Sequence, residues 1–342
     1  MSLALVIRRL ALAGLILCLS VVVLGAYVRL TAAGLGCPDW PGCYGAPSPL
    51  GLAQDASAQA NFPQTPVNVG KAWREMTHRY AAGALGLVIV TLTVLSLTRR
   101  GRQLIGVRFA AALLAILILQ ASLGMLTVTL RLTPLVVTLH LIFGMTTLAL
   151  LAWLWLSVNE SPRAAAPGTD GKLARRLTLA ALVMLALQIA LGGWTSSNYA
   201  AIACPDFPTC QGSFWPATDY PHAFVLWTGL GVNYEGGRLA GPARVAIQLT
   251  HRLGAAAVTL MLILAAGVTL KHVAVRAVRR AAGLVLGLLA LQLLIAISMV
   301  EAGFPLLLAT AHNAVAALLL LATVCLHRKL RPGPALAQGS GG

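Results

Sequence analysis

The spacing of charged residues is the feature that most constrains this chain of 342 residues. Only 10% of the residues are charged, whereas a typical soluble domain has about a quarter. A helix needs about 20 mostly apolar residues to cross a bilayer. Eight stretches of at least 18 residues contain no charged side chain: 10–28, 80–98, 109–130, 132–159, 177–205, 253–270, 281–300 and 302–327. This pattern predicts an all-α integral membrane protein with eight transmembrane helices.

The net charge of +16 is unevenly distributed between the two sides of such a membrane protein. With eight spans, both termini and the even-numbered loops share one side. That side carries 17 of the 25 basic residues: Arg8, Arg9, Arg99, Arg100, Arg102, Arg108, Arg163, Lys172, Arg175, Arg176, Lys271, Arg276, Arg279, Arg280, Arg328, Lys329 and Arg331. The positive-inside rule makes this face cytoplasmic and puts the long loops, 31–74 and 197–246, outside. No nucleic-acid recognition motif accompanies the charge, so no nucleic-acid partner is expected.

Each long loop contains the same cysteine pattern, "CPDWPGC" at 37–43 and "CPDFPTC" at 204–210. An outer loop lies in an oxidising compartment, where disulfides persist. We therefore expect the intraloop disulfides Cys37–Cys43 and Cys204–Cys210, either as structural clips or as redox-active pairs. Zinc ribbons need a tighter cysteine spacing. The two other cysteines, Cys18 and Cys325, fall within spans and are expected to be inert packing residues.

The repeated cysteine loop belongs to a duplication of the whole chain. "LGAYVRLTAAGLGCPDWPGC" aligns without gaps with "LGGWTSSNYAAIACPDFPTC", and "MTHRYAAGAL" matches "LTHRLGAAAV". The sequence therefore predicts two four-helix halves, 1–165 and 166–330, followed by a disordered tail, 331–342. Each half crosses the membrane an even number of times, so the halves share one orientation. We expect two tandem four-helix bundles related by a pseudo-two-fold axis along the membrane normal.

Four of the seven histidines follow this duplication, one on the second and one on the fourth helix of each half. All four fall within about two helical turns of the outer surface; they are His78, His140, His251 and His312. Ionisable groups within a membrane are costly and mark function by default. The remaining histidines are expected at interfaces: His222 in a loop, and His272 and His327 at cytoplasmic helix ends.

The spacing of these four histidines favours haem. Two imidazoles on antiparallel helices can face each other across a bundle and supply both axial ligands of one haem iron. A di-iron site is the alternative, because Glu75 precedes His78 with the Glu-x-x-His spacing that such bundles use. The second copy has Gln248 before His251, and no further acid lies within a span. Copper or zinc would need thiolates or more ligands at each site. One haem site per half is the prediction.

At these residues the chain resembles a known family. The motif "VRLTAAGLGCPDWPGCYG", the later "EMTHR" and the single histidines resemble the haem A synthase family, in its bacterial form with paired cysteines in both outer loops. The resemblance runs from Arg29 to Arg328. One departure is Ala33, where relatives often carry Ser, which puts only a local loop contact in doubt. The resemblance implies an oxidoreductase of the bacterial cytoplasmic (inner) membrane. Such an enzyme oxidises the C8 methyl group of haem O to a formyl group, giving haem A for cytochrome oxidase.

The resemblance also implies a division of labour between the halves. His251 and His312 would hold the cofactor, haem b, as axial ligands of its iron, while haem O as substrate would bind near His78 and His140. Haem O synthase and the cytochrome oxidase assembly machinery are candidate partners beside membrane lipids. A homo-oligomer is a candidate assembly. The electron acceptor and the source of the formyl oxygen stay open.

One difference between the halves supports that division from the residues alone. Glu75 stands one helical turn before His78, whereas the second half has Gln248 at the matching position. A carboxylate there could accept a proton or stabilise positive charge at the methyl carbon. The alternative is a carboxylate bonded to Arg74 or Arg79 at the helix start.

Further polar residues accompany the histidines. Arg79 and Arg252 each follow a histidine, and we expect either propionate contacts or interfacial anchors. Three glutamines in spans are expected to form hydrogen bonds between helices rather than to bind a ligand: Gln120, Gln188 and Gln292.

Two other functions compete with the enzyme. A bis-histidine membrane cytochrome b passing electrons between quinol and an acceptor would use both haems equally and leave Glu75 unexplained. A transporter with parallel repeats would need a route through both faces, whereas the four intramembrane histidines lie near one face. The sequence therefore favours the oxidoreductase.

Overall fold

The computed structural model describes residues 2–159, 169–227, 229 and 231–331, and within these ranges the chain is helical without any strand. Eight helices are long and apolar enough to cross a membrane, which confirms the predicted all-α membrane protein with eight spans. They are α1 (Leu3–Leu30), α3 (Val69–Ser96), α5 (Val107–Thr129), α6 (Pro134–Asn159), α7 (Thr169–Ser197), α9 (Gly241–His272), α10 (Arg276–Glu301) and α11 (Leu306–Lys329). Three shorter helices are α2 (Ala56–Asn61), α4 (Arg99–Leu104) and α8 (Tyr220–Ala223). Of the predicted disordered tail, 331–342, the structure describes Arg331 alone, and 332–342 lie outside the described residues.

Local capping signals set several helix ends. Asn68 caps α3, where its side chain accepts a hydrogen bond from the Lys71 amide at 2.9 Å. Proline opens α6 and stands near the start of α9, positions where the missing N–H costs nothing. Helix α3 begins eleven residues before the charge-free stretch 80–98, because its first turns contain charged side chains. The charge-free stretch 177–205, by contrast, runs past the end of its helix, because α7 ends at Ser197.

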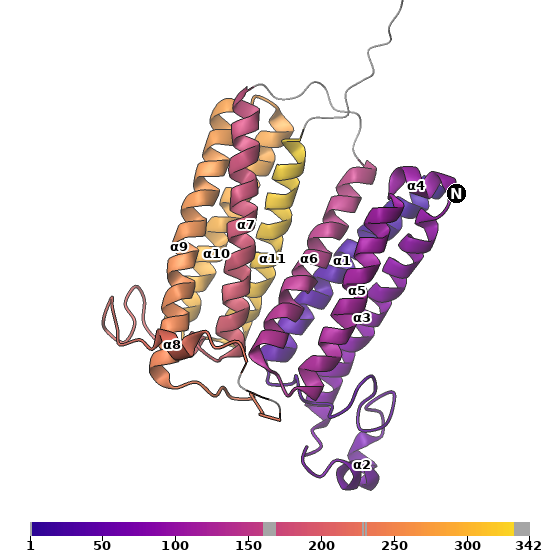
Figure 1. The fold of residues 1–342 in the computed structure, drawn as a ribbon, viewed down its shortest axis with the longest axis vertical. Helices are drawn as coiled ribbons and strands as arrows, with labels where there is room; N and C mark the ends of the chain where they lie inside the picture. The colour runs from indigo at the N-terminus through magenta and orange to yellow at the C-terminus, as the bar shows by residue number, and fades with distance from the viewer. Residues whose placement is uncertain (1, 160–168, 228, 230, 332–342) are drawn as a thin grey trace, which may run out of the picture.

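The helices form two groups of four in which each helix packs against its neighbours around a ring (Figure 1). In the first group, α1 and α5 each contact both α3 and α6, so α3 and α6 stand at opposite corners. In the second group, α7 and α10 each contact both α9 and α11, which places α9 and α11 at opposite corners. The helices that carry the four intramembrane histidines are therefore the diagonal pairs.

Contacts between α6 and α7, α1 and α11, and α6 and α11 join the two groups. At the end of the seam near the long loops, Arg29 Nη2 donates to the Ser196 carbonyl at 2.6 Å and its guanidinium lies over the Tyr199 ring. Gly193 lets α7 pack closely against α6, because a Cβ at this position would stand 2.9 Å from Leu141 Cδ2. At the opposite end, the guanidinium groups of Arg328 and Arg331 lie over the Trp153 ring.

Candidate functional site

The four predicted histidines stand at matching depths in the two groups of helices. His78 and His251 are in the third turn of α3 and α9, and His140 and His312 are in the second turn of α6 and α11. All four helices begin at the end of the molecule that carries the long loops (Figure 1). The structure thus brings each pair to one level on two diagonal helices.

The first pair keeps ring nitrogens without protein partners. His78 and His140 lie near each other on the diagonal helices α3 and α6. Each has a buried Nδ1 that forms no hydrogen bond, which costs about 1–3 kcal/mol if nothing binds there. Glycines make room for both rings: a Cβ would lie 3.0 Å from His78 Cε1 at Gly25 and 3.5 Å from His140 Cε1 at Gly124. The pair therefore has buried Nδ1 atoms without protein partners, on rings that pack closely against glycines.

The second pair is held by glutamines. His251 and His312 also lie near each other, on α9 and α11. Gln188 Nε2 lies 3.0 Å from His251 Nδ1 and 2.9 Å from the His251 carbonyl oxygen. Gln292 Nε2 lies 3.1 Å from His312 Nδ1 and 3.2 Å from its Nε2. These contacts hold both rings in place against the neighbouring helices.

The predicted hydrogen bonds of the glutamines between helices are confirmed, and their partners are more specific than expected. Gln120 Nε2 donates to the His140 carbonyl at 2.9 Å, so all three glutamines bond a histidine residue on another helix. The recurrent Leu-Gln pair 20 residues before His140 and before His312 was the available signal. The glycines beside the rings carried no such signal, because nothing in the sequence assigns them to a histidine.

Both cysteine pairs form the predicted disulfides, Cys37–Cys43 and Cys204–Cys210, whereas Cys18 and Cys325 are free. In each loop an aspartate accepts hydrogen bonds from two amides that follow the second cysteine. Asp39 bonds Tyr44 N at 2.6 Å and Gly45 N at 2.8 Å. Asp206 bonds Gln211 N at 2.6 Å and Gly212 N at 3.0 Å. The duplicated sequence therefore builds the same turn twice.

Hydrogen bonds also set the titration of one of these loop acids. The Thr209 hydroxyl and the Gly212 and Gln211 amides lower the pKa of the Asp206 carboxyl. The ionised carboxylate accepts all of these bonds. The turn that follows Cys210 is thus built around a carboxylate anion.

We expect all four outer cysteines to resist alkylation when no reductant is present, as measured by mass spectrometry of the digested protein. The Cys204→Ser/Cys210→Ser double variant should lower yield or haem retention more than turnover per bound haem, because the bridge shapes a loop rather than reacting. Turnover lost at full haem occupancy would instead show that the pair is redox-active.

Arg79 and Arg252 tie these loops to the helices. Arg79 Nη1 donates to the Asp39 carbonyl at 2.9 Å and the Gly42 carbonyl at 2.5 Å. Arg252 donates to the Thr209 carbonyl at 2.6 Å and the Asp206 carbonyl at 2.8 Å. Each arginine follows a histidine and so couples the position of that helix turn to its cysteine loop. The predicted propionate contacts of both arginines stay a prediction.

Glu75 connects the same elements in the first group only. Its side chain is buried, Oε2 accepts a hydrogen bond from Cys37 N at 2.9 Å, and Oε1 pairs with Arg79. The ion pair with Arg79, foreseen as the alternative to catalysis, is therefore present. Gln248 is equally buried at the matching position, yet its Oε1 has no partner. The two halves therefore bury a side chain of similar size at this position, a carboxylate in the first half and an amide in the second.

The ligand sets exclude a multi-ligand metal cluster within the described part of the chain. No three His, Cys, Asp or Glu side chains converge there in a way that could hold a metal ion. A di-iron centre needs several carboxylates beside its histidines. A haem needs only two axial residues, because its ring supplies four nitrogens. The paired imidazoles and the adjacent glycines fit this requirement.

These features define a multi-pass membrane protein with two paired-histidine sites and two disulfide-closed loops. Its sequence identifies the family: residues 8–324 match the model of the COX15-CtaA family, described as cytochrome oxidase assembly protein, and the chain belongs to that family. A heme A synthase of Shewanella oneidensis is 39% identical over 314 residues, covering 92% of this chain and 93% of the relative. A heme A synthase of Methylobacterium sp. (strain 4-46) is 28% identical over 338 residues, covering 92% and 89%.

Proposed function

We propose that this protein is a haem A synthase, an oxidoreductase that converts a methyl group of haem O to the formyl group of haem A. The observation that carries this proposal is the likeness to the Shewanella oneidensis enzyme along almost the full length of both chains. The paired histidines on diagonal helices support it, since a haem substrate and a haem cofactor each need such a site.

In this proposal the second group of helices holds haem b through His251 and His312. Haem b, when bound, supplies the redox-active iron through which electrons leave the site. The protein contributes ring orientation, because Gln188 and Gln292 contact the two imidazoles at 3.0–3.2 Å. Gly192 leaves room for the first ring, since a Cβ there would stand 3.3 Å from His251 Cε1.

The first group would bind haem O as substrate near His78 and His140. The buried Nδ1 atoms of both rings, which have no protein partner, support this assignment. Glu75 lies one turn from His78 and is buried. We assign it the proton that leaves when the methyl C–H bond is broken, because Gln248 offers no such acceptor in the other half.

The duplication supports the proposed organisation of the chain. We propose two tandem halves, 1–165 and 166–330, related by a pseudo-two-fold axis along the membrane normal. The helix pairs correspond one to one, and the two rings have the same order of contacts. The positive-inside rule favours cytoplasmic termini and outward-facing haem sites in the bacterial cytoplasmic membrane. Cytochrome oxidase assembly would use the product, haem A.

Extraction and mass analysis of the pigments of purified protein would test this function. We expect haem b together with haem O, its hydroxylated form or haem A, in about equal amounts for the two sites. The control is protein from cells that make no haem O, which should carry haem b alone. Two haem b molecules per chain, with haem O present in the cells and no haem A formed, would instead indicate the cytochrome b.

A further inference from the structure

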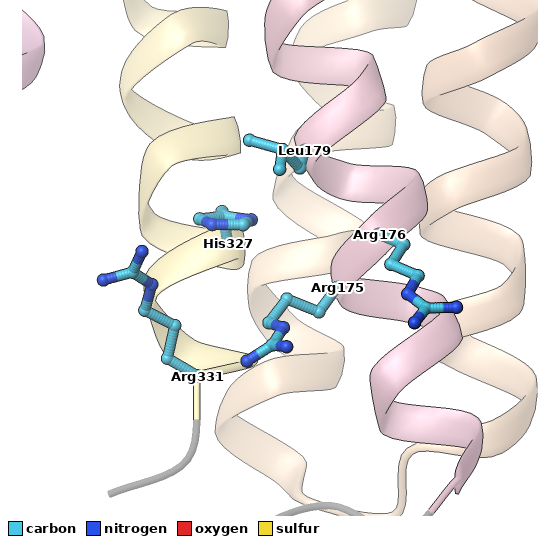
Figure 2. A pocket seen from close by; sticks show the side chains of 5 residues that line it. All are labelled: Arg175, Arg176, Leu179, His327 and Arg331. Carbon is cyan, nitrogen blue, oxygen red and sulfur yellow. The ribbon is translucent and has the colours of Figure 1, made fainter.

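A cavity of about 460 Å³ opens between α7 and α11 at the end of the molecule opposite the histidine pairs (Figure 2). Its lining is basic with one apolar side chain: Arg175, Arg176, Leu179, His327 and Arg331. The predicted topology puts this end at the cytoplasmic surface of the membrane. The cavity is therefore separate from the proposed haem sites and needs its own explanation.

The arginines that line this cavity, Arg175, Arg176 and Arg331, have no acidic partner among the residues that the structure describes. Arg331 instead lies over the Trp153 ring, with 4.7 Å between its guanidinium carbon and the ring centroid. Like-charged guanidinium groups that line one cavity repel one another. An anion placed among them would relieve that repulsion.

His327 provides a second and independent indication of a ligand. His327 lies in the last turn of α11, at the helix end that the sequence predicted, and is only 6% exposed. It is buried because α11 packs against α7 at this level. Its Nδ1 is buried and has no hydrogen-bond partner, and its ring lines the cavity beside Arg175 (Figure 2). A buried ring nitrogen of this kind is expected to have a partner.

The matching place in the other half is built differently. Arg8 corresponds to Arg175 in the duplication, and its Nε donates to the Val158 carbonyl at 2.8 Å. Trp155 corresponds to His327 when the halves are aligned on His140 and His312. In the first half the arginine is thus bonded to a backbone carbonyl, and a tryptophan takes the place of the histidine. The basic cavity is a property of the second half rather than of the repeat.

We propose that this cavity binds the phosphate headgroup of an anionic phospholipid. Arginine recognises phosphate oxygens through paired hydrogen bonds, and basic pockets between transmembrane helices on the cytoplasmic side suit anionic lipid headgroups. Leu179 continues from the cavity along α7 to Val183 and Leu187, at 52%, 54% and 62% exposure. This spacing of four residues forms one apolar stripe. An acyl chain can follow the stripe, which favours a lipid over free phosphate.

Native mass spectrometry of the delipidated full-length protein would test the site. We expect phosphatidylglycerol to bind at least about tenfold more tightly than phosphatidylcholine with the same acyl chains, because only the former leaves a net negative charge among the arginines. Inorganic phosphate at the same concentration should not displace it. Equal affinity for the two lipids, or displacement by inorganic phosphate, would overturn the proposal without any variant being made.

The double variant Arg175→Gln/Arg331→Gln locates the binding. Its affinity for phosphatidylglycerol should fall about tenfold or more, since two charge-assisted contacts are lost. Arg99→Gln/Arg100→Gln is the matched control, because it removes the same charge from the exposed helix α4 at the same predicted face. Equal losses in the two variants would show diffuse attraction to a basic surface and would contradict a defined site.

Discussion

Replacing His251 or His312 with Ala is expected to abolish the spectrum of six-coordinate low-spin haem b. Each replacement removes one of the two axial nitrogens that the proposed site provides, and no other His, Cys, Asp or Glu among the described residues clusters there as a substitute. The measurement is the reduced-minus-oxidised spectrum of the purified variant, together with its haem b content per chain.

Two further variants sharpen this expectation. His222→Ala is the matched control, because His222 lies exposed in the short helix α8 with its Nδ1 2.8 Å from Asp219 Oδ2. It should keep the full spectrum. Gln188→Leu should retain haem b but broaden or shift its spectrum, since it frees the His251 ring from the contact at 3.0 Å. If His251→Ala and His312→Ala each keep the parental spectrum, haem b is not bound by this pair.

The number of helices could be read from the sequence because a bilayer imposes a length on every apolar stretch. Helix ends could not be read in the same way. Lys71 and Arg74 interrupt the apolar pattern, yet they belong to the first turns of α3. A charge on a helix surface near the interface costs little. Charge-free stretches therefore predict the part of each helix that lies in the membrane core, but not where the helix begins and ends.

The histidines of the site could also be predicted, because the duplication separates His78, His140, His251 and His312 from the other three histidines. What surrounds them could not. The bonds of Arg79 and Arg252 run to loop carbonyls, and a backbone acceptor has no signature in the sequence. The burial of His327 depends on how α11 meets α7. A contact between helices far apart in the chain is not encoded locally.

The bonds of Glu75 are compatible with two roles, both of which the sequence already suggested. Glu75 could serve catalysis, or it could hold the cysteine loop through Arg79 and Cys37 N. The second half shows that the loop does not need the carboxylate. There Arg252 bonds the Thr209 and Asp206 carbonyls, while Gln248 Oε1 has no partner. A purely structural role therefore predicts a mild effect when Glu75 becomes Gln.

We expect the opposite for haem A formation. Glu75→Gln should lower its rate by about two orders of magnitude or more, because it removes a positioned proton acceptor or charge stabiliser while keeping the side-chain shape. The variant should bind haem O and accumulate it, or stop at the hydroxylated form, with little haem A. Pigment extraction from the purified variant, with haem A measured per haem b, gives the result.

The matched control for this prediction is Gln248→Ala, which changes the corresponding residue of the other half and should leave the rate per haem b within a few-fold of the parent. In Glu75→Gln itself, the low-spin haem b spectrum and the resistance of Cys37 and Cys43 to alkylation should both persist, because the remaining amide oxygen can still accept from Cys37 N at the present 2.9 Å. Loss of haem A with an opened loop would trace the defect to the tether between α3 and the loop. Haem A formed at the parental rate would remove Glu75 from the reaction and leave it as the partner of Arg79.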